Sequence, residues 1–428
     1  MKRRRAILIV PIALAAVLVG CGVSQPTPLQ KVTTGVSNRP GTAKPNNSLL
    51  ENPQVSQLTF FTEMNMLNST TGFISGYYNN KFSMWITSDG GLHWRLHEIP
   101  GVPTHNVRSG APPIMYFQSK NIGWIAWITR DKKQNVLTVL RTINGGRQWT
   151  KHTQEAPTVA NYIEQIDFSS HDDGWIRAFS GGAMNQGDTT ILRTTSGGKS
   201  WAMVSSTGGY IPNQQATAHA LPELDVPMPM VFTNTKDGWV AVGNVVQTQT
   251  SQATLYHTQT AGENWYPVHL PVPKVLAHDF ATVEYLPVFS RSEGTVLIQY
   301  QGKSNQVLTY HTTDSGKTWN TGTPLPLGKQ NYTVRQSFLS PEEGWIIGRT
   351  GSALEYTINA GESWQRIPTT GLLKSLIERG YTVEDLDMVT TSIGWVMLKR
   401  ISEADSKITT KVLETTDGGQ AWKEQNVN

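Results

Sequence analysis

The sequence of 428 residues predicts an all-β fold built from seven copies of one repeat. The first observation is an eight-residue pattern with Thr first, Gly fifth and Trp last, as in TSDGGLHW (87–94) and TTDGGQAW (415–422). The second is a Gly followed by alternating apolar residues, which lies 20 to 28 residues before each of these Trp residues. The third is composition, because 14 Trp and only 16% charged residues provide a large aromatic core.

The net charge gives no reason to expect a nucleic-acid partner. The formal charge of +4 comes entirely from Lys2 and the three arginines that follow it. Without these four residues the chain has 32 basic and 32 acidic side chains. The remaining protein therefore has no bulk attraction for polyanions.

The first twenty residues predict an export signal. MKRRR is a positive n-region, and the 15 residues from Ala6 to Gly20 form an apolar h-region. That stretch is shorter than the roughly 20 residues that a membrane-spanning helix needs. LVGC (18–21) resembles the lipobox of bacterial lipoproteins, which implies that Cys21 carries a diacylglycerol and becomes the first mature residue. The alternative is an ordinary signal peptide that contains a cysteine.

Cys21 is the only cysteine, so the chain can form no internal disulfide. Residues 21–54 then comprise the lipidated cysteine and a stretch rich in Ser, Thr, Pro, Asn and Gly without aromatic residues. Such a composition predicts a disordered tether. Two or three acyl chains would hold the protein stably. We therefore expect an exported protein anchored to the outer face of the cytoplasmic membrane.

The eight-residue pattern predicts a structural turn rather than a catalytic site. Its third position varies among Asp89, Asn144, Ser196, Thr260, Asp314, Asn359 and Asp417. Its final position is always tryptophan, at Trp94, Trp149, Trp201, Trp265, Trp319, Trp364 and Trp422. Asp, Asn and Ser can each bond their own backbone two residues on, whereas a catalytic carboxylate would not tolerate such exchange. The Gly supplies a positive φ angle, and no helix follows that would make the glycines a phosphate cradle.

The second signature predicts the strand that precedes each turn. It begins at Gly72, Gly123, Gly174, Gly238, Gly294, Gly344 and Gly394, and in five copies the next residue is Trp. A turn followed by alternating apolar residues is typical of a half-buried strand.

T-x-D-x-G-x-x-W resembles the Asp-box, or bacterial neuraminidase repeat, over residues ~56 to 428. This repeat occurs in sialidases, sortilin-type receptors, some glycoside hydrolases and photosystem II assembly and stability factors. The pairing of GW-x-x-G with TxDGGxxW is most similar to the last of these families. The resemblance implies that each copy closes the turn between the third and fourth strands of a propeller blade. It says little about function, because the same box occurs in enzymes and binding proteins.

Seven repeats imply a seven-bladed β-propeller of four-stranded antiparallel blades over residues 55–428, after the signal peptide (1–20) and the tether (21–54). The first strands are expected near 58–64, 71–78, 82–87 and 92–98, and the last near 420–427. The repeat therefore begins and ends in phase. Whether part of residues 22–54 adds a closing strand is left open. A WD40 propeller would need a shorter period and a G-H…W-D signature.

The longest connection, Ala202 to Met230, is the candidate binding loop, with Tyr210, His219, Glu223 and Asp225 as its candidate residues. Two further candidates are residues 101–113 and 369–388, and the latter is expected to contain a helical turn near 372–379. A solvated connector without a ligand is the alternative for each.

Catalytic and metal sites are not predicted. RIP (366–368) occurs after the sixth box, whereas a sialidase needs it near the first, so we interpret it as coincidence. Paired acids occur at 172–173, 342–343 and 384–387, and the first two pairs lie in turns, where acids are favoured. Glycosidase chemistry needs two carboxylates that face each other, which spacing in the sequence does not show. His278 precedes Asp279, and we interpret this pair as part of a surface loop. There is no H-E-x-x-H and no cysteine-based zinc pattern. We expect no cofactor.

The sequence therefore predicts a monomeric, non-catalytic platform that binds an envelope or membrane protein. The alternative is a glycan-binding or glycoside-hydrolysing surface protein, and a third hypothesis is a purely structural spacer.

Overall fold

The computed structural model describes residues 59–103, 112–130, 134–157, 160–180, 187–208, 216–222, 228–243, 254–283, 285–302, 305–328, 333–351, 353–402 and 407–427. The expected signal peptide, Cys21 and the tether lie outside these ranges.

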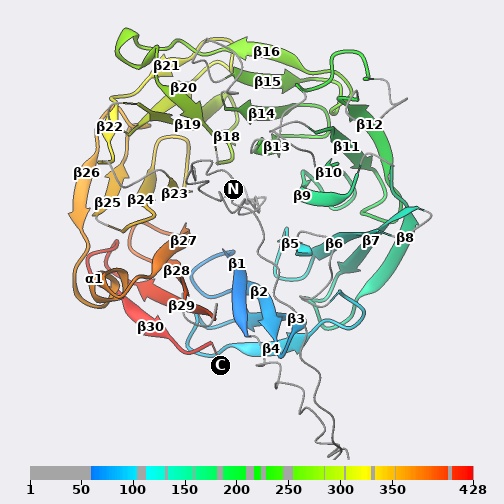
Figure 1. Ribbon diagram of the computed structural model, residues 1–428, viewed down its shortest axis with the longest axis horizontal. Coiled ribbons are helices and arrows are strands. Elements are labelled where there is room, and N and C mark those ends of the chain that lie inside the picture. The colour runs from blue at the N-terminus through cyan, green and yellow to red at the C-terminus, as the bar shows by residue number, and fades with distance from the viewer. Residues whose placement is uncertain are drawn as a thin grey trace, which may run out of the picture. The chain divides into compact units, whose positions relative to one another are not determined.

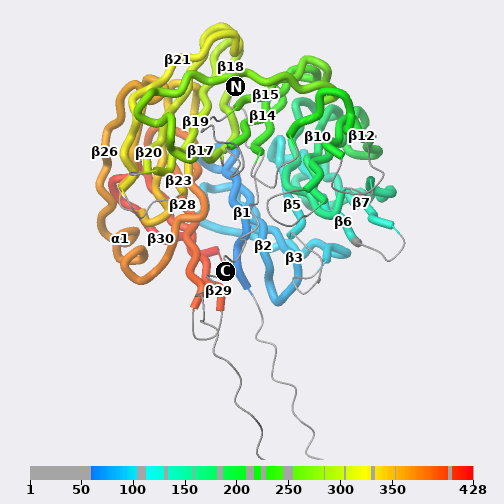
Figure 2. The backbone as a smooth tube through the Cα atoms, turned by 45° about the horizontal axis from the view of Figure 1, so that its top comes forward, coloured from blue at the N-terminus to red at the C-terminus, as the bar shows by residue number. Residues whose placement is uncertain are grey.

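Seven antiparallel sheets surround a central axis, and each sheet is built from consecutive strands (Figure 1). The first strand of each sheet lies nearest the axis and the last lies at the periphery. Figure 2 shows the same ring tilted, with the blue first sheet beside the red last sheet. The fold is therefore a seven-bladed β-propeller, as predicted.

The strands of the first three blades follow the predicted order. Blade 1 contains β1 (Phe60–Met66), β2 (Gly72–Tyr78), β3 (Lys81–Thr87) and β4 (Arg95–Glu98). Blade 2 contains β5 (Ile114–Phe117), β6 (Gly123–Arg130), β7 (Asn135–Thr142) and β8 (Thr150–Glu155). Blade 3 contains β9 (Tyr162–Phe168), β10 (Gly174–Phe179), β11 (Thr189–Thr194) and β12 (Ala202–Ser206).

The remaining blades add two short helices and two split strands. Blade 4 contains β13 (Met230–Phe232), β14 (Gly238–Val242), β15 (Thr254–Thr258) and β16 (Tyr266–His269), followed by η1 (Lys274–Leu276). Blade 5 contains β17 (Phe280–Thr282), β18 (Val288–Ser290), β19 (Glu293–Gln301), β20 (Gln306–Thr312), β21 (Asn320–Thr321) and β22 (Leu325–Pro326). Blade 6 contains β23 (Val334–Phe338), β24 (Gly344–Gly348), β25 (Ala353–Thr357) and β26 (Gln365–Pro368). After α1 (Gly371–Glu378), blade 7 contains β27 (Thr382–Met388), β28 (Gly394–Ile401), β29 (Ile408–Thr415) and β30 (Lys423–Gln425).

Aromatic stacking joins neighbouring blades. The last residue of an inner strand packs on the aromatic residue that follows the Gly of the preceding blade. Phe168 of blade 3 stacks on Trp124 of blade 2 with ring centroids 3.6 Å apart, and Phe232 of blade 4 stacks on Trp175 of blade 3 at the same distance. Both tryptophans are fully buried. These nearly parallel ring pairs bury a large apolar area at each of the two junctions.

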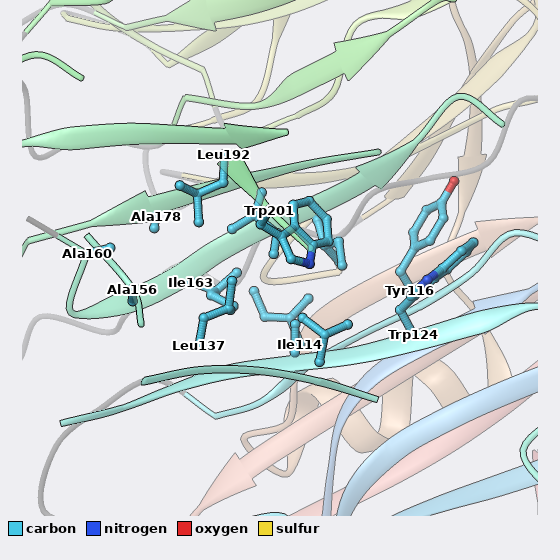
Figure 3. Packing of buried hydrophobic residues seen from close by; sticks show 14 of the residues in the cluster. Ile114, Tyr116, Trp124, Leu137, Ala156, Ala160, Ile163, Ala178, Leu192 and Trp201 are labelled. Carbon is cyan, nitrogen blue, oxygen red and sulfur yellow. The ribbon is translucent and has the colours of Figure 1, made fainter. Parts of the chain in front are cut away.

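The core between blades 2 and 3 shows how the interfaces are filled. Figure 3 shows side chains from both sheets packed together, with Tyr116, Trp124 and Leu137 from blade 2 and Ile163, Leu192 and Trp201 from blade 3. Trp201, the last residue of its repeat turn, packs in this cluster with Trp124 and Leu137 of the preceding blade.

Within the described residues, the ring closes without a strand shared between blades 1 and 7. Residues 22–54, for which a closing strand was left open, lie outside these ranges. Blades 1 and 7 each have four strands from one continuous segment, so the predicted phase of the repeat is confirmed. Met66 of β1 and Trp395 of β28 share one buried cluster. The Oδ2 atom of Asp387 accepts a hydrogen bond from the Met66 amide at 2.6 Å, and the Thr410 hydroxyl accepts one from the Phe61 amide at 3.0 Å.

Candidate functional site

The seven repeat turns (87–94, 142–149, 194–201, 258–265, 312–319, 357–364 and 415–422) share one hydrogen-bond scheme. In the first, the buried Thr87 hydroxyl donates to Asp89 Oδ1 at 2.9 Å and accepts from the Gly91 amide at 2.8 Å. Asp89 Oδ1 also accepts from the His93 amide at 3.0 Å. The bond from the fifth residue to the Thr hydroxyl recurs in all seven turns at 2.8–3.1 Å.

The third residue of each turn accepts from the amide four residues on, at 2.9–3.1 Å. The prediction that it bonds two residues on is therefore wrong, although Asp, Asn, Ser and Thr do exchange because each offers one acceptor oxygen. Hydrogen bonds from the Thr318 side chain and backbone lower the pKa of Asp314 to about 2. A hydrogen bond from the His93 side chain likewise lowers the pKa of Asp89. These carboxylates are poor proton donors near neutral pH.

The Gly at the fifth position closes its own turn and also lies in close contact with the preceding blade. Its φ angle lies between 81° and 96° in all seven copies, a region that side chains disfavour. A Cβ atom on Gly316 would lie 2.2 Å from the Trp239 ring of blade 4, and one on Gly419 would lie 2.3 Å from Leu354 of blade 6. Each of these turns therefore rests directly on the preceding blade.

Polar side chains on the inner strands connect one blade to the next. Asp167 Oδ2 accepts from the Phe232 amide at 2.8 Å, and Ser337 Oγ accepts from the Met388 amide at 2.7 Å. Gln165 Oε1 accepts from the Met230 amide at 2.9 Å. Asp387 makes the equivalent bond across the closing junction. These groups fix the spacing of the inner strands, so their hydrogen bonds serve the fold.

Glu63 is a buried carboxyl group on β1. Burial, with a contribution from the charge of Asp385 on β27, raises the pKa of Glu63 to about 8. Its Oε1 atom has no hydrogen-bond partner, and only 2% of the residue is exposed. The group is therefore protonated at neutral pH and out of reach of a large substrate.

Buried and half-buried arginines are paired with acids on the inner side of the ring. Arg177 on β10 is fully buried and pairs with Glu164 on β9. Arg349 Nη2 lies 2.6 Å from Glu384 Oε1, and Arg335 donates from Nε to the Glu384 carbonyl at 2.6 Å. These pairs join β23, β27 and the residue after β24, so they also connect blades 6 and 7.

Of the four candidate residues in the predicted binding loop, the structure describes only His219; Tyr210, Glu223 and Asp225 lie outside the described residues. His219 is exposed, and its ring lies 4.9 Å from that of Tyr266 on β16. Its carbonyl accepts from the Trp265 amide at 2.8 Å. This part of the connection therefore lies against the outer strand of blade 4. The first five residues of the predicted loop form the outer strand β12.

The other sequence candidates occupy structural positions. Asp173 bonds Ser170 Oγ within its turn at 3.1 Å, and Glu343 accepts from the Tyr356 hydroxyl at 2.7 Å. His278 is exposed in the segment after η1. The predicted helical turn is confirmed as α1, which buries Leu373 and Leu376.

The described residues offer neither a metal site nor a membrane-spanning helix. None of their clusters of His, Cys, Asp and Glu could hold a metal ion. Within the same ranges, no helix combines the length and apolar character needed to cross a bilayer.

A pocket of about 250 Å³ opens between blades 5 and 6. Its lining comprises Pro326, Leu327, Gly328, Ile346, Gly348, Ala353, Glu355 and Arg366. Glu355 is 8% exposed, and Arg366 Nη1 lies 3.5 Å from its Oε1 atom. Burial raises the pKa of the Glu355 carboxyl group, and the charge of Arg366 opposes this rise. The pocket lies near the β24–β25 hairpin, at the end of blade 6 away from its repeat turn.

Sequence reasoning missed Glu355 and this pocket. A signal was present, because Glu355 stands two residues before the Thr of the sixth turn, where the other copies have Trp, Leu or Tyr. Arg366 had been noted only as part of RIP. It faces Glu355 across β25 and β26.

Comparison with known proteins gives one sequence match of limited length. The chain is 36% identical over 113 residues to the chloroplastic photosystem II stability/assembly factor HCF136 of Arabidopsis thaliana. This match covers 26% of the present chain and 25% of the relative. No protein-family model matches the chain.

Three solved structures are similar to the chain at low identity. YCF48 bound to a D1 peptide is 16% identical with a TM-score of 0.49, over 84% of this chain and 93% of that one. YCF48 from Cyanidioschyzon merolae is 17% identical with a TM-score of 0.44, over 76% and 86%. A polysaccharide lyase of family PL25, an ulvan lyase, is 11% identical with a TM-score of 0.45, over 84% and 92%. Binders and enzymes both occur among these structures, so they do not decide what this chain does, whereas the sequence match makes it similar to a photosystem II assembly factor.

Proposed function

We propose that this protein is a non-catalytic assembly platform that binds another protein at the cell envelope, with a lipid on Cys21 as its membrane anchor. The observation that carries the proposal is the 36% identity over 113 residues to an assembly factor. A photosynthetic role is not part of the proposal, because the match covers a quarter of each chain.

The structure supports a binding role through the way its polar groups are used. The inner-strand side chains Gln165, Asp167, Ser337 and Asp387 bond the next blade, and the repeat turns use their acids internally. A rigid ring of this kind leaves recognition to the connections between blades and to the second-to-third strand hairpins. The candidate loop within 202–230 and the pocket beside the β24–β25 hairpin both belong to these connections.

The carboxylates give less support to glycoside hydrolysis. That chemistry needs two carboxyl groups roughly 5–10 Å apart on either side of the sugar. Glu63 has a raised pKa but is 2% exposed. The lining of the pocket between blades 5 and 6 contains one carboxylate, Glu355.

In-cell crosslinking followed by capture through a C-terminal tag tests the platform. We expect one membrane protein in near-equal amount, and its loss from a strain that lacks Tyr210 to Pro227. A matched strain with Cys21→Ser tests the anchor: the protein should leave the membrane fraction and no longer incorporate a labelled fatty acid. Recovery of cell-wall glycan alone, or of nothing above background, would contradict the platform and favour the carbohydrate alternative.

A further inference from the structure

The seven blades can be compared position by position, because each repeat turn fixes the register of the strand before it. Two residues before the turn Thr, the third strand directs a side chain toward the preceding blade. Six blades have an apolar or aromatic residue there: Trp85, Leu140, Leu192, Tyr256, Tyr310 and Leu413. Blade 6 alone has a charged residue, Glu355. Positions that break the rule of their own repeat are expected at functional sites.

The same face of blade 6 is hollowed by small residues. Ile346, Glu355 and Arg366 lie directly opposite one another on β24, β25 and β26. Two residues further along their strands, Gly348 and Ala353 extend this face with almost no side chain. Pro326 at the end of β22, with Leu327 and Gly328 of the connection that follows it, forms the facing wall. The resulting space of about 250 Å³ is therefore built by the sequence at a position where neighbouring blades have bulk.

The charge in this pocket is incompletely compensated. The Glu355 side chain is 11% exposed, whereas its Arg366 partner is 62% exposed at a distance of 3.5 Å. A buried carboxylate is stabilised by a closely placed cation, and a largely hydrated guanidinium at this distance supplies little of that stabilisation. Burial raises the pKa of the Glu355 carboxyl group by more than the charge of Arg366 lowers it. The cation therefore compensates only part of the cost of burying this carboxylate.

We propose that this pocket binds the side chain of a lysine presented by the partner protein, with the ammonium group at Glu355 and the aliphatic stem along Pro326 and Leu327. This inference rests on the proposed platform function and names the partner's chemistry at one contact. A lysine combines a compact charge with a long apolar stem, which matches one carboxylate above apolar walls. The volume is below the roughly 300–1,000 Å³ of pockets for drug-sized ligands, so it fits one side chain rather than a run of sugars.

Calorimetric titration of the mature protein with Nα-acetyl-lysine methylamide tests the site, and the Nε-acetylated derivative, which lacks the charge, is the control ligand. We expect binding of the charged ligand alone. Glu355→Leu should weaken it at least about tenfold, because the charged partner is removed. Leu occupies this position in blades 2, 3 and 7, so the fold should tolerate it.

Arg366→Gln distinguishes a binding role from a structural ion pair. It removes the competing cation, so we expect tighter ligand binding, by about threefold or more. A Glu355–Arg366 pair that serves only the fold would instead give no ligand effect and the same loss of thermal stability in both variants. That result, or equal binding of the ligand by wild type and Glu355→Leu, would overturn the assignment.

Capture from cells separates this inference from the platform itself. If the wild-type protein recovers a partner and Glu355→Leu recovers markedly less, both stand. If a partner is recovered but the wild-type protein does not bind the lysine derivative, the pocket assignment is wrong and the platform stands. If the lysine derivative binds but Glu355→Leu leaves partner recovery unchanged, the pocket does not take the partner's lysine. If no partner is recovered, the platform fails, and with it the claim about the partner.

Discussion

Asp387→Ala tests how the ring is held closed. Asp387 lies on β27, is 4% exposed, and accepts the Met66 amide of β1 at 2.6 Å. Blades 1 and 7 are joined by non-covalent contacts alone, which comprise such hydrogen bonds and a shared apolar cluster, whereas the chain runs directly through every other junction. The substitution removes a hydrogen bond to a charged group and leaves a buried amide unpaired. Each effect is about 1–3 kcal/mol and the two overlap, so we expect the free energy of unfolding to fall by about 3 kcal/mol.

Two matched variants distinguish an effect on ring closure from the loss of a single hydrogen bond. Asp387→Asn keeps an acceptor oxygen and should lose only about 1 kcal/mol. Asp167→Ala removes the corresponding bond to the Phe232 amide, 2.8 Å, at the junction between blades 3 and 4, where the chain continues. It should lower stability by a similar amount without opening the ring.

Urea unfolding followed by tryptophan fluorescence measures the free energies, and hydrogen exchange measured by mass spectrometry locates the opening. In Asp387→Ala, the amides of β1 and β27 should exchange faster than those of the other inner strands. The reasoning is refuted if Asp387→Ala unfolds as the wild type does, or if its exchange pattern matches that of Asp167→Ala.

Three further predictions concern the repeat and the buried acid. Trp265→Ala should lower the free energy of unfolding by about 3–5 kcal/mol. Trp364→Ala should lower it by less, because Trp364 is half-buried whereas Trp265 is buried. An unchanged melting temperature for Trp265→Ala would contradict the blade assignment. Because Glu63 has a folded pKa of about 8 against 4.5 unfolded, its contribution is complete below pH 4.5 and is lost as the pH rises to 8. Stability should fall by about 1.4 kcal/mol per pH unit over that range, whereas Glu63→Gln should show a flatter profile in urea titrations. Ala360 has a φ of 55° in its turn, an angle that Gly adopts without strain. Ala360→Gly should therefore raise the free energy of unfolding by about 0.5–1 kcal/mol, and the melting temperature slightly. A lower melting temperature would show that this strain is absent.

The sequence predicts the scaffold well because the scaffold repeats. Thr87, Gly91 and Trp94 recur in every blade, and a single physical requirement, a turn that packs on its neighbour, explains all the copies. The order of the strands and the phase of the ring follow from that spacing, whereas β4 and β30 begin three residues later than expected, at Arg95 and Lys423. The detail that the third residue bonds four residues on, rather than two, depends on the backbone path through two successive residues of positive φ such as Gly90 and Gly91. Composition does not reveal that path.

The candidate site was harder to predict because its features depend on pairs of blades. Asp387 and Met66 are 321 positions apart in the chain, and nothing local marks them as partners. Glu355 could have been noticed as an exception among seven copies, but the pocket beside it also needs Pro326–Gly328 from another blade. Length in sequence drew attention to the connection within 202–230, whereas His219, the one candidate residue described there, packs on the outer strand of blade 4.

The closing junction uses the same kind of hydrogen bond as the junctions between blades 3 and 4 and between blades 6 and 7, so the ring does not depend on one particular starting blade. A circular permutant that begins with blade 4, ends with blade 3 and carries a linker between blades 7 and 1 would be held shut by Asp167 and the Phe232 amide, in the manner of Asp387 and Met66 in the present order. Tolerance of such rearrangement is highest where new ends fall in exposed connections. Whole blades can then be exchanged or re-ordered as units. A blade with an altered face, such as blade 6, could be placed between different blades while the ring still closes through the same kind of hydrogen bond.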